Sequence, residues 1–188
     1  AAGREYLQIE EEIFNLLKNT NISLTILRPT MIYGYLDDAN VSKFIKMIDK
    51  IRLFPLVKGG KYELQPVNYS DLGIAYYQVL LNAETTRNKN YTISGKNVIY
   101  LKDMLMSISD FLGKKTRFFS VPFCFAYLAA WVIYFLSFTL FDYREKVQRL
   151  VEPRAYAHDE AIKDFNYSPM DFWDGLKREV ELYRNKKS

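Results

Sequence analysis

Hydrophobic positions repeat along the chain with two spacings, and the two spacings alternate. Apolar residues three or four apart predict helices, and short runs of β-branched and aromatic residues predict strands. The predicted helices cover residues 5–18, 40–50, 71–81, 101–112, 143–150, 158–165 and 170–185. The predicted strands cover residues 22–27, 62–67, 90–94 and 116–121, the first of them buried. Strands that alternate with helices indicate an α/β protein with a parallel sheet, and the helix-rich second half indicates an added lobe.

Several helix ends and one loop can be predicted from single residues. Asp37 or Asp38 is expected to cap the second helix, and the pair Ser70-Asp71 is expected to cap the third. Gly113 closes the helix that begins near residue 101. Residues 53–60 contain one proline and two adjacent glycines, so we predict a loop there.

One long segment, residues 121–141, has no charged side chain. Its length is close to the roughly 20 apolar residues that span a bilayer. Basic residues lie on both sides of it: Lys114, Lys115, Arg117, Arg144 and Lys146. Because an all-apolar helix is either buried in protein or in lipid, three interpretations stay open. The segment spans a membrane, contacts one membrane face, or is buried in the lobe or against a partner protein.

Composition narrows the function classes. The 188 residues are 49% hydrophobic and 26% charged, which excludes a disordered or collagen-like chain. One cysteine, Cys124, and one histidine, His158, exclude an internal disulfide and a zinc site built from several such residues. The net charge is +4, and the basic residues are spread along the chain, so we expect a generic basic surface and no nucleic-acid partner. We predict no metal site and a reducing, cytoplasmic location, with or without membrane association.

The most informative motif is Leu27-Arg28-Pro29-Thr30-Met31-Ile32-Tyr33-Gly34, which begins at the end of the first predicted strand. It resembles the L-R-P-x-x-[IV]-Y-G signature of the extended short-chain dehydrogenase/reductases, the NAD-dependent epimerase/dehydratase family. Further matches to this family follow in its order, in residues 38–41, 54–60, 65–72, 91–95 and 158–169. The form Gln65-Pro66-Val67 is similar to the atypical branch that includes the accessory subunit of respiratory complex I.

The resemblance implies that the chain is the C-terminal part of such a protein. Residues 1–95 would be the C-terminal portion of a Rossmann-type parallel sheet, with a substrate-lobe insertion at about 35–61. Residues 96–188 would form a smaller, mostly helical substrate lobe that contains the apolar segment. This would also explain why the sequence starts inside a helix.

The resemblance further implies a site and a cofactor, NAD or NADP. Pro29, Thr30 and Met31 match the segment that lines the nicotinamide end of the cofactor in the family, and the other interpretation is that Pro29 simply ends a strand. Asn40 matches a residue that touches the substrate diphosphate, and a plain helix N-cap is its other interpretation. Arg149 and Arg154 fall where the family often has a phosphate-binding arginine, and a solvated arginine is the other interpretation. Tyr33-Gly34 is expected to be a turn with a packed ring.

The family's chemical machinery is expected upstream. The eight glycines contain no G-x-x-G-x-x-G spacing. The one Tyr-x-x-x-Lys, Tyr183 to Lys187, lies in the basic tail, so we name no catalytic residue in this chain. Sugar-nucleotide enzymes commonly place a phosphate-binding arginine seven residues before the aspartate that corresponds to Asp71, and here that residue is Leu64.

Two functions therefore stay open. The chain is part of an NAD(P)-dependent epimerase, dehydratase or reductase for a small molecule such as a nucleotide-linked sugar, with a homodimer as its assembly. Alternatively, it is a non-catalytic relative that docks on a membrane surface or a partner protein through residues 121–141.

Overall fold

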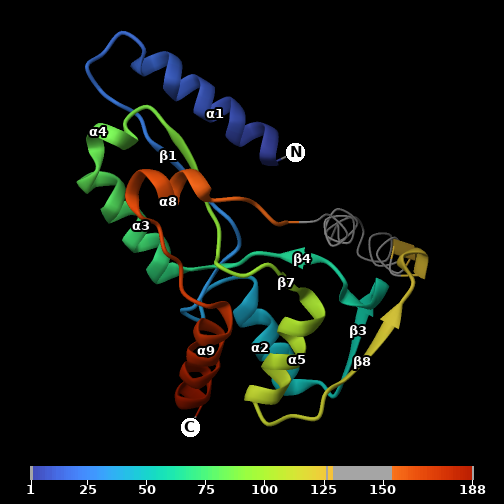
Figure 1. Ribbon diagram of the computed structural model, residues 1–188. Helices are drawn as coiled ribbons and strands as arrows, with labels where there is room; N and C mark the ends of the chain where they lie inside the picture. Colours follow the sequence, from blue (N-terminus) through green and yellow to red (C-terminus); the bar gives the residue numbers. More distant parts are fainter. Residues whose placement is uncertain (1, 126, 129–153, 188) are drawn as a thin grey trace.

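The computed structural model describes residues 2–125, 127–128 and 154–187 (Figure 1). Its helices are α1 (Ala2–Leu17), α2 (Val41–Lys50), α3 (Tyr69–Leu81), α4 (Ala83–Thr86), α5 (Leu101–Phe111), α8 (Asp159–Phe165) and α9 (Phe172–Lys187). Its strands are β1 (Ile26–Pro29), β2 (Ile32–Tyr33), β3 (Leu53–Val57), β4 (Glu63–Leu64), β5 (Val67–Asn68), β6 (Asn90–Ile93), β7 (Ile99–Tyr100) and β8 (Arg117–Val121). A 3-10 turn, η1 (Lys58–Gly60), follows β3.

The strands form pairs, and most of these pairs are parallel. β1 pairs with β6, β2 with β5 and β3 with β8, all in parallel, whereas β4 and β7 are antiparallel. Parallel partners far apart in the sequence, joined through helices, are typical of the α/β class. The predicted fold class is therefore confirmed.

Two clusters of buried side chains hold these pairs and helices together. The first lies among β5, α3, β6, α8 and the residues after α8: Val67, Ala75, Val79, Tyr91, Ile93, Ala161, Phe165 and Tyr167. The second and larger cluster centres on α2, α5 and α9, and its most buried members are Val41, Ile45, Ile48, Met104, Leu105, Ile108, Phe172, Leu176 and Val180. Because α8 belongs to the first cluster and α9 to the second, the end of the chain joins the two (Figure 1).

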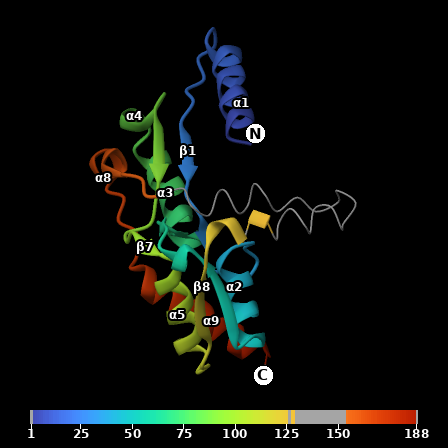
Figure 2. The same ribbon diagram turned by 90° about the vertical axis from the view of Figure 1, so that its right-hand side faces the viewer.

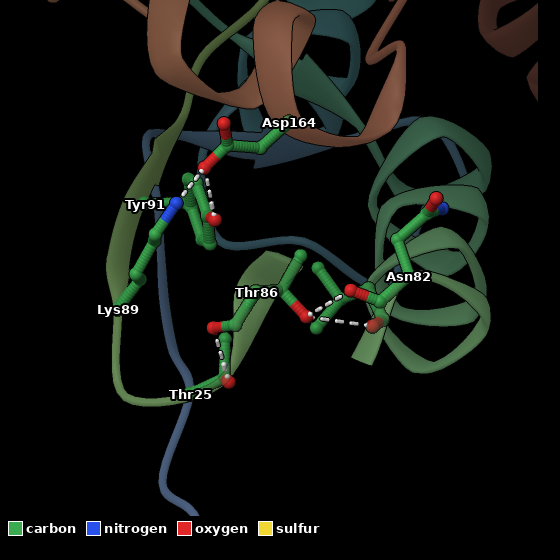
Figure 3. A network of polar contacts seen from close by, with 7 residues as sticks. Thr25, Asn82, Thr86, Lys89, Tyr91 and Asp164 are labelled. Carbon is green, nitrogen blue, oxygen red and sulfur yellow. Dashed lines mark hydrogen bonds and ion pairs between the residues drawn. The ribbon is translucent and has the colours of Figure 1, made fainter. Parts of the chain in front are cut away.

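Polar contacts fasten the first cluster at its rim (Figure 3). The Thr25 hydroxyl donates to the Thr86 carbonyl oxygen at 2.8 Å, which ties the entry of β1 to α4. Lys89 and the Tyr91 hydroxyl both donate to Asp164 of α8, each at 2.6 Å. These two donors hold the pKa of Asp164 below its usual range, while burial raises that of Tyr91. The β1–β6 pair is thus bound to α4 and to α8.

The loop predicted for residues 53–60 is wrong, because most of that segment is strand β3. Phe54 and Leu56 are buried, while Leu53 and Pro55 are exposed, which is the alternation of a half-buried strand. Pro55 has no N–H group to donate, and among the described residues β3 has one partner, β8. A proline fits on the open edge of such a strand.

Two predicted strands are shorter than expected. The first begins at Ile26 instead of residue 22, and its residues are half-buried or exposed rather than buried. The segment 62–67 divides into β4 and β5 because Gln65 and Pro66 leave the ladder between them.

The caps of two helices differ in how well they were predicted. Asp38 caps α2 as expected, since its carboxylate accepts from the backbone N–H groups of Asn40 at 2.8 Å and Ser42 at 3.1 Å. Asn40 occupies the N-cap position, but its own side chain makes no capping bond. The expected Ser70-Asp71 cap of α3 is wrong, because Asn68 is the cap and accepts from the Ser70 N–H.

Part of the long apolar segment lies outside the described residues. This applies to residues 126 and 129–153, and therefore to most of 121–141 and to Arg149. In the part of the chain that is described, no helix combines the length and the apolar character needed to cross a bilayer. The three interpretations of the segment stay predictions.

Candidate functional site

A pocket of about 420 Å³ opens where β1 ends beside β6. Its walls are formed by Arg28, Pro29, Thr30, Met31, Asn40, Leu64, Gln65, Thr92, Arg154 and Tyr156. The structure therefore brings together Pro29, Thr30, Met31, Asn40 and Arg154, the five predicted site residues within the described ranges. Their roles stay predictions. Open parallel sheets bind ligands beyond the carboxyl ends of their strands, and this pocket has that location.

Backbone bonds fix the segment that follows β1. The Thr30 N–H donates to Ile93 O at 3.0 Å, which continues the parallel ladder with β6. The Thr30 hydroxyl donates to Gln65 O at 2.5 Å, and Met31 O accepts from the Val67 N–H at 3.0 Å. Because this short segment is bound on both sides, its side chains have a fixed position in the pocket wall.

Gln65, a buried residue that sequence reasoning did not single out as a site residue, organises the pocket floor. Its Nε2 donates to Gly95 O and its Oε1 accepts from the Tyr156 N–H, both at 2.7 Å. The approach at Gly95 is close, since a Cβ atom there would lie 1.8 Å from Pro66 O. Gln65 thus connects the end of β6 to the returning chain that carries Arg154. The Gln65-Pro66-Val67 form was the one available signal.

Arg154 enters the pocket beside β4. Its backbone N–H donates to Glu63 O at 3.0 Å, and it bridges to Leu64 in parallel. The second pocket arginine, Arg28, is paired with Glu10 of α1, which lowers the pKa of that glutamate. Leu64 lines the same pocket, at the position where sugar-nucleotide enzymes have an arginine. Arg154, to which the resemblance assigns phosphate binding, thus lies in the same pocket as Arg28 and Leu64.

His158 has a packing role next to the pocket. The Ser94 hydroxyl donates to Tyr156 O at 2.8 Å and lies 2.7 Å from His158 Nδ1. Because the Ser94 hydroxyl donates its one proton to Tyr156 O, the His158 Nδ1–H must donate to the Ser94 oxygen. Burial lowers the pKa of His158, which favours the neutral ring with a proton on Nδ1. The ring also packs edge-on against Tyr167.

A second hollow, of about 500 Å³, lies next to Asn40, and Tyr33 and Asp38 help to line it. The Tyr33 ring is buried 5.1 Å from that of Phe172, and Gly34 has a φ of +123°. The predicted turn with a packed ring is therefore confirmed. A Cβ atom at Gly34 would lie 2.6 Å from the Asn68 amide, so this turn requires glycine.

Glu179 of α9 lies beneath this turn and is 0% exposed. Its Oε1 accepts from the Leu36 N–H at 3.2 Å, whereas its Oε2 has no hydrogen-bond partner among the described residues. Burial, followed by the nearby Asp38, raises the pKa of Glu179 to about 8. A protonated Glu179 is therefore the favoured form at neutral pH. No pattern in the sequence pointed to this residue.

The remaining predicted positions lie away from the pocket. Tyr183 and Lys187 both contact Asp49 of α2, the former at 3.0 Å. Together with Lys114, these groups hold the pKa of Asp49 well below its usual range. Asp71 is buried and accepts from the Met170 N–H at 3.0 Å, so it joins the start of α3 to the segment before α9.

Comparisons with known proteins agree with this fold. No family model matches the chain. Over 114 residues it is 26% identical to the NADH dehydrogenase [ubiquinone] 1 alpha subcomplex subunit 9 of Arabidopsis thaliana mitochondria. This match covers 61% of the chain and 27% of the relative. The chain superposes on UDP-glucose 4-epimerase from Thermotoga maritima with a TM-score of 0.71 and 15% identity, over 97% of this chain and 52% of the enzyme. It also superposes on a dTDP-glucose 4,6-dehydratase from Bacillus anthracis, solved with NAD, with a TM-score of 0.66 and 16% identity. This match covers 95% of this chain and 50% of the dehydratase.

The chain thus spans about a quarter of the curated relative and about half of the solved proteins. At these identities the solved structures show the fold, and the sequence match agrees with the resemblance to the atypical branch. The chain has the fold of the C-terminal part of the NAD-dependent epimerase/dehydratase proteins, as its motifs predicted.

Proposed function

We propose that the chain is the substrate-side part of an NAD(P)-dependent epimerase/dehydratase-type oxidoreductase. Its pocket would receive the nicotinamide end of NAD or NADP and a phosphate-bearing small molecule, such as a nucleotide-linked sugar. The observation that carries this proposal is the convergence of Pro29, Thr30, Met31, Asn40 and Arg154 on one pocket. Its volume, about 420 Å³, lies in the range of small-molecule sites, roughly 300–1,000 Å³.

The pocket chemistry suits such ligands. The Arg154 guanidinium can bind a phosphate with two parallel hydrogen bonds. The exposed Asn40 amide can bind sugar hydroxyls or a second phosphate oxygen, and Pro29, Met31 and Leu64 offer apolar surface to a flat ring. The cofactor, when bound, would supply the hydride chemistry, while these residues bind and orient the reactants.

The residues for the cofactor phosphates and for acid–base chemistry would come from a nucleotide-binding part that packs on α1. Support comes from the exposed apolar side chains of α1, of which Phe14 and Leu16 are clear examples. Support also comes from β1, which pairs only with β6 among the described residues. In a complete parallel sheet, a further strand would pair with β1, and the apolar side of α1 would pack against the sheet.

Titration calorimetry of the full-length protein tests the proposal with NADH and with UDP-glucose. We expect Arg154→Gln to weaken UDP-glucose binding about 10- to 100-fold, the range for a hydrogen bond to a charged group. Arg178→Gln, at an exposed position of α9, removes the same charge away from the pocket and is the control. Equal affinities of wild type, Arg154→Gln and Arg178→Gln for UDP-glucose would exclude Arg154 as the phosphate ligand.

A second candidate function is non-catalytic docking within a larger assembly. It is favoured by Leu64, which replaces an arginine of the sugar-nucleotide enzymes, and by the similarity to a subunit of NADH dehydrogenase. This candidate predicts that the full-length protein binds NADH but turns over no sugar nucleotide. Steady epimerisation of UDP-glucose, followed by chromatography of the sugars, would exclude it.

A further inference from the structure

Two separated segments hold an excess of positive charge. Residues 50–62 and 111–121 contain seven basic side chains and no acidic one, whereas the whole chain has a net charge of +4. All seven are exposed: Lys50, Arg52, Lys58, Lys61, Lys114, Lys115 and Arg117. Of the seven, Lys114 pairs with Asp49, which lies just before the first segment. The other six basic side chains remain, and neither segment contains an acidic residue. The remainder of the chain has a net negative charge.

The fold brings these segments together as the parallel β3–β8 pair, which we name the ribbon (residues 53–57 and 117–121). The ribbon lies on the right of Figure 1 and faces the viewer in Figure 2. Its inner face contributes Phe54 and Leu56 to the core. Leu53 lies opposite Arg117 in the register, and Pro55 lies opposite Phe119. These four residues are exposed and form the outer face.

The outer face is both apolar and basic. Leu53 is 60% exposed and Phe119 is 43% exposed, although both are large hydrophobic residues. Further along the chain from β8, Phe125 and Leu128 are 63% and 60% exposed. The Lys58 ammonium lies 5.5 Å from the centre of the Phe123 ring, so a cation and an aromatic ring meet at this end of the ribbon. Apolar side chains and cations thus project from one exposed structure.

We propose that the outer face of the ribbon docks on the surface of an anionic lipid bilayer. Cations are attracted to anionic headgroups, and exposed apolar side chains gain free energy when they enter the headgroup region. A bilayer surface offers both kinds of contact over a wide area, anionic headgroups for the cations and an apolar interior for side chains such as Leu53. The inference rests on the ribbon alone and is independent of the ligand in the pocket.

Vesicle flotation with the full chain tests this docking surface, because bound protein rises with the vesicles whereas aggregates sink. We expect flotation with phosphatidylcholine vesicles that contain phosphatidylglycerol, little with phosphatidylcholine alone, and a decrease with added salt. The triple variant Arg52→Gln, Lys115→Gln, Arg117→Gln removes one cation of the ribbon and two exposed cations that flank its strands, and we count it among the ribbon variants. It should lose about 100-fold in affinity, roughly five-fold per cation. Phe119→Ser should weaken the salt-resistant remainder of the binding.

A matched triple variant, Lys163→Gln, Lys177→Gln, Arg178→Gln, removes the same charge from exposed positions of α8 and α9. It should float like the wild type, and so should Arg154→Gln, which separates this proposal from that for the pocket. If both triple variants lost vesicle affinity equally, net charge alone would explain the binding, and the proposal would be overturned. Binding to neutral vesicles that no ribbon variant changes would overturn it too. A ribbon-dependent mobility shift of duplex RNA without flotation would replace the bilayer by a nucleic acid.

Discussion

Replacing Glu179 with glutamine should change how stability depends on pH. Glu179 is fully enclosed beneath the turn that carries Tyr33 and Asp38, and its Oε1 accepts from the Leu36 N–H. Burial is the first reason that its pKa rises to about 8, and the Asp38 carboxyl is the second. Glutamine keeps the shape and the acceptor, and its amide can donate where only a protonated carboxyl could. The variant therefore removes the titration and leaves the packing in place.

The size of the effect follows from proton linkage. The pKa of glutamate in an unfolded chain is about 4.3, so between that value and about 8 the folded protein binds one proton more than the unfolded protein. The free energy of unfolding must then fall as pH rises, by about 1.4 kcal/mol per pH unit. Over the whole interval this amounts to about 4–5 kcal/mol as an upper value. Glu179→Gln should match the wild type near the unfolded pKa and be the more stable protein at pH 8.

Urea unfolding of both proteins, followed by circular dichroism across this pH range, measures the difference. His158 also titrates here, but its lowered pKa gives the opposite slope, and it is present in both proteins. Subtracting the two curves therefore isolates Glu179. Glu181→Gln, at an exposed position of the same helix, is the control and should follow the wild type. Parallel curves for Glu179→Gln and wild type would refute a buried, protonated Glu179.

Three further predictions concern other parts of the fold. Asp49→Asn should cost about 1–2 kcal/mol of unfolding free energy at pH 7, because a buried carboxylate loses ammonium partners that are themselves partly exposed. This cost should shrink as pH falls below about 4, where the unfolded aspartate takes up its proton, and a constant cost in acid would contradict the ion-pair explanation. Leu64→Arg should tighten UDP-glucose binding about 10-fold in calorimetry, while Leu64→Met should not, and equal affinities would exclude phosphate binding at this position. Gly95→Ala should destabilise by about 2 kcal/mol or more, because its Cβ would lie 1.8 Å from Pro66 O, and an unchanged melting temperature would disprove that close approach.

Local signals account for the parts of the fold that could be predicted. Asp38 and Gly113 mark the start of α2 and the end of α5, because capping depends on residues within one turn. The strand β3 was missed because its formation depends on β8, about sixty residues later, and not on its own composition. Pro55 argues against a strand in isolation, yet it is harmless on an edge without a second partner.

Several pocket residues could be predicted from the sequence because their motif lies at the end of a strand. In a parallel sheet of this kind, the strand ends line the ligand site. Pro29 ends β1, and Thr30 and Met31 follow it directly, so their convergence needs only that strand to be placed correctly. Gln65 and Tyr156 could not be assigned in this way. They are joined by a hydrogen bond between residues far apart in the chain, and neither belongs to a residue type that implies such a bond.

The distribution of charge shows most clearly what a linear sequence leaves out. Basic residues spaced along a chain predict a diffuse surface, and on that basis no nucleic-acid partner was expected. Folding pairs residues 53–57 with 117–121 and thereby brings together the longer segments 50–62 and 111–121, which contain cations but no carboxylates. The surface is therefore basic at this place, although each segment alone contributes only four or three cations. Expecting no nucleic acid then depends on Leu53 and Phe119, whose exposed apolar side chains suit a bilayer better than a phosphate backbone.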